Sequence, residues 1–150
     1  MGERVCYVGL LDEEGQVLDL SWIYLCRVYD LPKRANEIHG TRVLVDRVWP
    51  RGVKKDALHL DAWLRDVAPS NELRKWFGHD PARWEEFQRR YRDELAAPER
   101  QAALQELLDL VRAGPVTLLY GARNEEHNQA VALKAVVEAT LGRSNATQRS

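Results

Sequence analysis

The chain has 150 residues, a length that fits one domain, and its 45% hydrophobic and 30% charged residues are typical of a globular protein. The formal net charge of −1 argues against a protein that coats nucleic acid or a membrane surface by bulk attraction. No apolar run approaches the roughly 18 residues of a membrane span, and no signal peptide is recognisable, so we expect a cytoplasmic protein with no membrane partner.

The first third of the chain predicts β-structure. Apolar runs at 5–11 and 17–20 flank an acidic turn, which predicts an added N-terminal hairpin over residues 1–21. Residues 22–29 are rich in aromatic and β-branched side chains and predict a strand. After a polar loop, residues 41–46 have a continuously apolar centre, which is typical of a strand covered on both faces.

The spacing of the apolar residues becomes helical near residue 60. Leu60, Trp63, Leu64 and Val67 fall on one face of a helix, and Pro69 ends it. These four residues therefore predict the first helix after the strand that ends at Asp46.

Three further helices are predicted before the next strand. Ser70 is placed to cap a short helix that ends at residue 77. Asp80 and Pro81 form a cap followed by a first-turn proline, which begins a helix to about residue 96. Pro98 begins another helix, which ends before residue 114. We expect burial of Trp63 and of the aromatic and aliphatic face of the third helix, formed by Trp84, Phe87, Tyr91 and Leu95.

The last third of the chain predicts one more strand and one more helix. Residues 116–120 are continuously apolar, Asn124 is placed to cap a final helix, and residues 142–150 are expected to be a flexible tail. Strands separated by helices predict a single α/β domain over residues 1–150, a Rossmann-like three-layer sandwich with a small, mostly parallel sheet. We expect the strands that end at Asp46 and Tyr120 to be neighbours, helices on both faces, and a four-helix insertion between these strands.

A basic loop follows the first of these two strand ends. Four cations occur within nine residues of the segment 46–55. Ligands of open parallel sheets bind outside the carboxyl ends of the strands, and arginine matches the geometry of phosphate and carboxylate oxygens. The loop therefore predicts an anion site in which Arg47, Trp49 and Arg51 contact the ligand. A solvated basic loop, balanced by acidic neighbours, is the alternative.

The second strand end leads into the last helix. Tyr120, Arg123 and His127 are candidate ligand-binding residues, because neighbouring strands would bring them to the basic loop. Gly121 would let a ligand approach the backbone closely. An ordinary strand-to-helix turn is the alternative for this segment, and His127 could simply support the start of the helix.

Two groups are candidates for proton transfer. Asp46 lies among cations, which should lower its pKa and keep it ionised, as suits an electrostatic role or a base. His79 could reach the same cleft from the helical insertion, together with Arg74 as a ligand-binding residue. The histidines lack metal-ligand spacing, and neither Cys6 nor Cys26 lies beside a basic cluster, so we expect no metal and no cofactor.

Several motifs follow one another in a defined order. They are GTRVLVDRVWPRG (residues 40–52), APS (68–70), LRKWFGHD (73–80), LLYGAR (118–123) and HN (127–128). Together they resemble the YeaO-like family, a bacterial domain of unknown function, over about residues 24–141. The resemblance implies no particular reaction. More distant relatives carry a Cys-His-Arg triplet where this chain has Asn128, Gln129 and Ala130, a departure that argues against transferring a thiol or metal role.

Two kinds of function remain open. The first is an enzyme or binding domain for a small anionic molecule, such as a nucleotide or sugar phosphate, at the carboxyl edge of the sheet. The second is a non-enzymatic interaction module whose basic loop contacts an acidic protein or a nucleic-acid backbone. A concave cluster of the candidate residues favours the first function, and a flat basic stripe favours the second.

Overall fold

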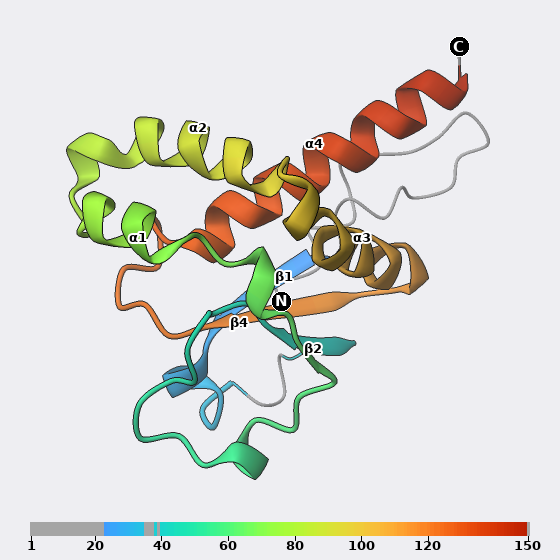
Figure 1. Cartoon of the computed structure of the whole chain (residues 1–150). Helices are drawn as coiled ribbons and strands as arrows, with labels where there is room; N and C mark the ends of the chain where they lie inside the picture. Colours follow the sequence, from blue (N-terminus) through green and yellow to red (C-terminus); the bar gives the residue numbers. More distant parts are fainter. Residues whose placement is uncertain (1–22, 35–37, 39, 150) are drawn as a thin grey trace.

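A small parallel sheet organises the protein. The computed structural model describes residues 23–34, 38 and 40–149, so the hairpin predicted over residues 1–21 lies outside the described residues. Within these described residues, the sheet has four parallel strands in the order β1-β4-β2-β3 (Figure 1). Their bounds are β1 Ile23–Arg27, β2 Thr41–Leu44, β3 Ala62–Trp63 and β4 Val116–Tyr120. The sheet and its helices confirm the predicted α/β class.

The central strand is β4, which pairs with β1 on one side and β2 on the other. Leu118, for example, lies between Leu25 and Val43 in the pairing register. All five residues of β4 are buried, which explains why its sequence is apolar except for Thr117. The prediction that the strand before Asp46 and the strand ending at Tyr120 are parallel neighbours is confirmed.

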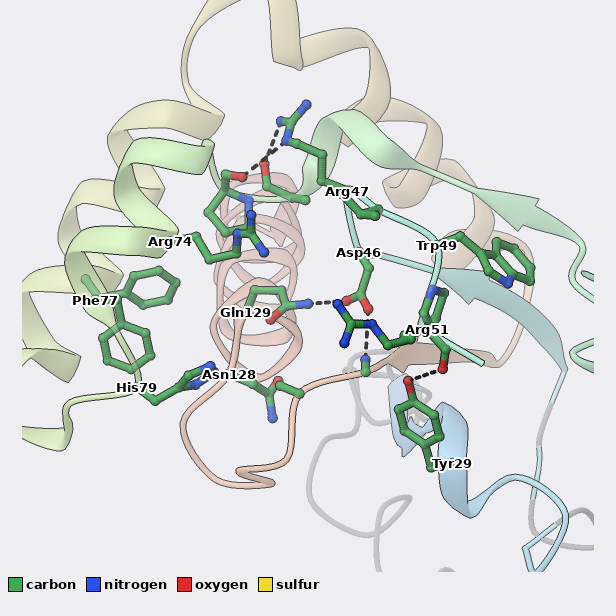
Figure 2. Close-up of a pocket in the computed structure, with 17 residues that line it drawn as sticks. Tyr29, Asp46, Arg47, Trp49, Arg51, Arg74, Phe77, His79, Asn128 and Gln129 are labelled. Atoms are coloured by element: carbon green, nitrogen blue, oxygen red, sulfur yellow. Dashed lines mark hydrogen bonds between the residues drawn. The ribbon is translucent and has the colours of Figure 1, made fainter. Parts of the chain in front are cut away.

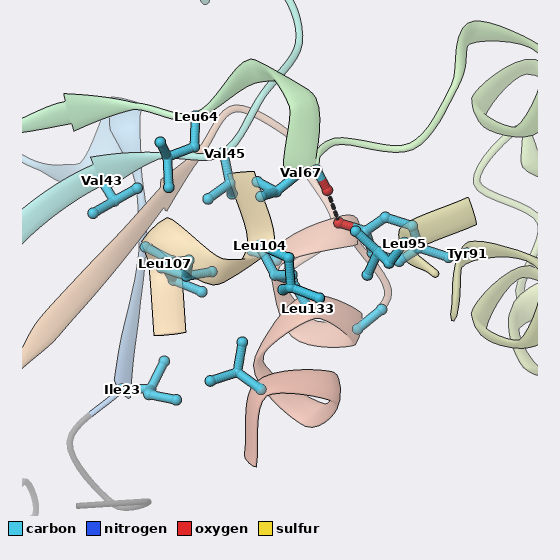
Figure 3. Packing of buried hydrophobic residues seen from close by; sticks show 14 of the residues in the cluster. Ile23, Val43, Val45, Leu64, Val67, Tyr91, Leu95, Leu104, Leu107 and Leu133 are labelled. Carbon is cyan, nitrogen blue, oxygen red and sulfur yellow. Dashed lines mark hydrogen bonds between the residues drawn. The ribbon is translucent and has the colours of Figure 1, made fainter. Parts of the chain in front are cut away.

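The four α-helices of the described residues lie on the same side of the sheet (Figure 1). They are α1 Asn71–Phe77, α2 Trp84–Leu95, α3 Pro98–Ala113 and α4 Gln129–Arg149. Figure 3 shows Val43 and Val45 of the sheet layer meeting Leu107 and Leu133 of the helices. Because side chains alternate along a strand, the residues next to Val43 and Leu118 in sequence point to the other face.

That other face carries a smaller core. Leu44, Leu119 and Cys26 pack there against Leu58 and Val28. Within residues 23–34, 38 and 40–149, this core is covered by two short 3-10 helices and the loop after β2, with no α-helix on this side. The predicted three-layer sandwich with helices on both faces is therefore not confirmed.

The helix predicted from residue 60 does not form. Residues 62–63 are strand β3, and a 3-10 helix follows at Arg65–Val67. The backbone N–H of Leu64 donates to the carbonyl of Leu44 (3.0 Å), and the indole N–H of Trp63 donates to the carbonyl of Asp46 (2.7 Å). These bonds hold the segment at the sheet, so the insertion between β2 and β4 has three α-helices and not four.

The start of the last helix also differs from the prediction. The side chain of Asn124 accepts the N–H groups of Glu126 and His127 (2.8 Å each), which forms a local turn. The cap is Asn128, whose Oδ1 accepts the N–H of Ala130 at 2.9 Å and a second N–H one residue later. Helix α4 then runs through residue 149, across the segment that was expected to be a tail from residue 142.

The predicted aromatic face of the third helix is largely correct. Phe87, Tyr91 and Leu95 are fully buried in the larger core. Trp84 and Trp63 are only half-buried, because each packs at the rim of a core and keeps one side toward solvent. None of the helices in the described ranges combines the length and apolar character that a membrane crossing requires.

Candidate functional site

A pocket of about 280 Å³ lies at the carboxyl edge of the sheet (Figure 2). The ends of β2 and β4 form its floor, and the loop after β2, the turn before α1, the end of α1 and the start of α4 form its walls. Six of the nine residues predicted for the site line it. They are Asp46, Arg47, Trp49, Arg51, Arg74 and His79.

Asp46 lies at the centre of the pocket and is held from two sides. Its Oδ2 accepts the backbone N–H of Gly121 (2.9 Å), and its Oδ1 accepts the side-chain amide of Gln129. A Cβ added at Gly121 would lie 3.0 Å from Oδ2 of Asp46, which is tighter than about nine in ten real Cβ contacts. Gly121 is therefore required for the close approach of the carboxylate, and not for an unusual backbone conformation.

The pKa of Asp46 is raised from its ordinary value of 3.8 to about 6. Burial of the carboxylate is the dominant cause, and it outweighs the hydrogen bonds from Gly121 and Gln129 and the nearby charge of Arg74, all of which lower the pKa. The expectation of a lowered pKa is wrong, because the sequence showed the neighbouring cations but not the depth of the carboxyl group. A carboxyl group with this pKa exchanges its proton near neutral pH.

The arginines of the pocket fall into two groups. The guanidinium of Arg47 donates to the carbonyls of Ala68 (3.2 Å) and Pro69 (3.3 Å), so it fixes the turn before α1. Arg51 and Arg74 have exposed side chains, and Figure 2 shows both reaching toward the space beside Asp46. These two arginines are the most accessible cationic groups for a ligand.

The loop that carries Arg51 is anchored by two aromatic side chains. The hydroxyl of Tyr29 donates to the carbonyl of Arg51 (2.7 Å), and the indole N–H of Trp49 donates to the carbonyl of Val53 (2.6 Å). The Trp49 ring points away from the pocket in Figure 2 and packs edge-on against Trp63, with 5.3 Å between centroids. Trp49 therefore shapes the loop more than it offers a surface to a ligand.

One wall of the pocket is apolar. Phe77 and Phe87 are stacked with 4.4 Å between their ring centroids, and both line the pocket. The ring of His79 lies 6.0 Å from that of Phe77. His79 has a left-handed backbone (φ 59°), and its exposed side chain is directed toward the pocket (Figure 2).

Three predicted site residues lie elsewhere. Tyr120 is buried in the larger core, Arg123 is exposed outside the pocket lining, and the ring of His127 packs 5.0 Å from that of Trp84. Asn128 and Gln129 take their place in the lining. Sequence reasoning missed these two because neutral amides carry no strong motif, although their position just after the end of β4 was a usable signal.

Asn128 and Gln129, at which the sequence departs from the Cys-His-Arg triplet named above, make structural hydrogen bonds. Asn128 is buried, caps α4 and donates to the carbonyl of Asn124 (2.7 Å), while Gln129 is bonded to Asp46. Cys26 lies buried on the opposite face of the sheet. In the part of the chain that the structure describes, no three His, Cys, Asp or Glu side chains cluster as metal ligands would.

Comparison with known proteins identifies the family. Residues 22–150 match the family described as "Inactive DUF488-N3 subclade". "Uncharacterized protein YeaO" of Escherichia coli is 43% identical over 107 residues, which cover 71% of this chain and 89% of the relative. "Uncharacterized protein Rv3073c" of Mycobacterium tuberculosis is 45% identical over 94 residues, 63% of this chain and 77% of the relative. No solved structure gives a significant match. The order of motifs, the match over nearly the whole chain and the similarity to YeaO establish that this chain belongs to the YeaO-like family.

Proposed function

We propose that this protein binds a small anionic ligand, such as a nucleotide or a sugar phosphate, in the pocket at the carboxyl edge of the sheet. The observation that carries the proposal is the convergence of Arg47, Arg51 and Arg74 on one concave site. Asp46 is the single acidic residue among the described residues that line this site, so the cations exceed the anions. The proposal also relies on the general rule that ligands of open parallel sheets bind beyond the carboxyl ends of the strands.

Hydrogen bonds from two arginines are strong enough to bind a phosphate with useful affinity. A hydrogen bond to a charged group contributes about 1.5–3 kcal/mol, and Arg51 and Arg74 could both contact one phosphate. The pocket volume of about 280 Å³ is close to the lower limit for small-molecule sites. A compact anion suits this space better than an extended one. A cytoplasmic location, as the sequence predicts, suits a ligand of this class.

Binding is the primary role in this proposal. The family description contains the word "Inactive", and Asn128 and Gln129 are committed to structural hydrogen bonds. Asp46 and His79 are the pocket groups that could move a proton if the ligand were also converted. We therefore expect saturable binding of the ligand.

Isothermal titration calorimetry with inorganic phosphate, AMP and ribitol 5-phosphate tests the proposal. Arg51→Glu and Arg74→Glu should each weaken binding by at least about tenfold, since each removes one charge-assisted contact and adds a repulsive charge. Arg112→Glu is the matched control, because Arg112 is exposed on α3 outside the pocket lining and undergoes the same charge change. Anion binding to Arg51→Glu that equals wild-type binding would contradict the proposed site.

One observation favours the second candidate, an interaction module. Val48 is 62% exposed, and Lys54 and Lys55 are exposed on the same loop. An exposed apolar side chain among cations is compatible with contact to an acidic protein or a nucleic-acid backbone. Binding of a DNA duplex or of polyglutamate that depends on Lys54 and Lys55, with no affinity for small phosphates, would favour this candidate.

A further inference from the structure

Besides its arginines, the pocket contains the carboxylate of Asp46, a hydrogen-bond acceptor that can take further donors. An ionised carboxylate offers about four lone-pair sites to donors. The N–H of Gly121 and the amide of Gln129 occupy two of the sites on Asp46. Asp46 lines the pocket, so about two acceptor sites are left for a ligand.

This acceptor makes the pocket a better match for an anion that also carries a hydrogen-bond donor than for an anion alone. An ionised Asp46 repels a phosphate, and in a partly buried site the repulsion is stronger than in water. A ligand that places a hydrogen-bond donor on Asp46 and its anionic group on Arg51 and Arg74 makes a favourable contact with both kinds of group. The pocket therefore favours a ligand that carries an anionic group and a donor.

A hydroxyl group suits the donor position beside Asp46 better than an ammonium group does. Arg47, Arg51 and Arg74 all line the pocket, and their charges disfavour a ligand cation beside Asp46. A hydroxyl is neutral and still donates a charge-assisted hydrogen bond to a carboxylate. The apolar side chains of Phe77 and Pro50, which also line the pocket, suit the C–H groups of a carbon chain that bears hydroxyls.

We infer that the pocket recognises a phosphorylated polyol or monosaccharide, with the phosphate on Arg51 and Arg74 and a pair of hydroxyls on Asp46. This inference rests on the proposed anion binding and narrows it to a ligand class. The cavity volume of about 280 Å³ suits one sugar phosphate and is small for a dinucleotide.

Three ligands with the same five-carbon chain test the inference on the wild-type protein. Ribitol 5-phosphate carries hydroxyls, pentyl phosphate carries none, and 5-aminopentyl phosphate carries an ammonium group. Calorimetry should give an affinity for ribitol 5-phosphate at least about tenfold above that for pentyl phosphate, because a site built to bind hydroxyls discriminates against analogues that lack them. Equal affinities, or tightest binding of 5-aminopentyl phosphate, would overturn the inference while leaving anion binding intact. Failure of every phosphate, including inorganic phosphate, would overturn both.

The role of Asp46 is tested by removing its carboxylate. Asp46→Ala should reduce the preference for ribitol 5-phosphate over pentyl phosphate to about twofold or less, and the affinity for pentyl phosphate should not fall, since a repulsive charge is lost. Asp109→Ala, an exposed aspartate of α3, is the control and should keep the full preference. A preference that persists in Asp46→Ala would place the hydroxyl contact on another group. If Asp46→Ala does not fold, the comparison of the three ligands on the wild-type protein still decides.

Discussion

The carboxylate of Asp46 accepts the backbone N–H of Gly121, a residue 75 positions later, at a distance of 2.9 Å. This bond joins the end of β2 to the end of β4 at the edge of the sheet where the pocket lies. Two motifs that are far apart in sequence, DRVWPRG and YGAR, therefore meet at one hydrogen bond. Their co-occurrence in the chain has a direct physical reason.

Gly121→Ala should destabilise the protein and disturb the pocket. The added Cβ would lie 3.0 Å from Oδ2 of Asp46, so the carboxylate must shift by a few tenths of an ångström, which disturbs its bonds to Gly121 and Gln129. Overpacking of this kind costs about 1–3 kcal/mol, measurable by urea unfolding. Gly114→Ala is the control, because a Cβ there meets no atom within 4 Å, and it should cost clearly less. Equal effects of the two substitutions would contradict the close approach.

The raised pKa of Asp46 predicts a loss of stability with rising pH. The folded protein binds the Asp46 proton up to about pH 6, whereas the unfolded chain releases it near 3.8. The native state therefore holds more protons between these values, and the free energy of unfolding falls as the pH rises from about 4 to about 6. The full contribution is about 2–3 kcal/mol.

Urea unfolding at pH 4, 5, 6 and 7 measures the free energy of unfolding of wild type and of Asp46→Asn. All other groups titrate in both proteins, so the difference between the two free energies reports on Asp46 alone. The amide of Gln129 can rotate to accept a hydrogen bond from Asn or from protonated Asp at position 46, so the variant should fold. Wild type should lose stability relative to Asp46→Asn as the pH rises. A difference that stays constant across the series would mean that burial does not perturb this carboxyl group.

Two tyrosine substitutions that each remove one hydroxyl should differ in cost. Tyr91 is fully buried and donates to the carbonyl of Val67, so Tyr91→Phe leaves a buried acceptor without its donor and should cost about 1–3 kcal/mol. Tyr29 is 41% exposed and donates to Arg51, and water can replace its hydroxyl. Tyr29→Phe should therefore cost about 0.5 kcal/mol or less. Thermal and urea unfolding compare the two, and a larger cost for Tyr29→Phe would contradict the buried contact.

Arg123 and Arg74 provide a test of the pocket boundary. Both are exposed, but Arg74 lines the pocket and Arg123 does not. Arg74→Glu should lower phosphate affinity by at least about tenfold, whereas Arg123→Glu should change it by about threefold or less, an effect that salt screens. Calorimetry at low and physiological ionic strength separates the two. A larger effect of Arg123→Glu would move the binding site to the turn after β4.

The strands were the most predictable part of the fold. Val43 and Leu118 belong to short, uninterrupted apolar runs, and such runs have few alternatives to a buried strand. The spacing of Leu60, Trp63, Leu64 and Val67 was misleading for a physical reason. Leu64 and Val67 pack in the larger core and the other two in the smaller one, so the four residues contact opposite faces of the sheet and share no helical face.

The composition of the pocket was only partly predictable. Arg51 and Asp46 could be assigned because charged residues directly after a buried strand have a known position relative to the sheet edge. Gln129 could not, since its role depends on where α4 begins, and the choice between Asn124 and Asn128 as cap is settled by tertiary packing. The pKa of Asp46 depends on burial in three dimensions, which local charge in the sequence does not report.

The position of β4 between β1 and β2 has a consequence for the order of folding. In the described part of the chain, β1 and β2 do not pair with each other, and Val116 of β4 lies between Ile23 and Thr41 in the register. β1 and β2 therefore lack the strand that joins them until β4 has been synthesised, whereas β2 and β3 can already pair with each other. The residues that pair between β4 and the earlier strands are far apart in sequence. The chain therefore loses the entropy of closing long segments before strand pairing stabilises it, and we expect folding to be slower than that of a helical bundle of the same size. Among the described strands, the sheet is therefore completed only when β4 joins β1 to the β2–β3 pair.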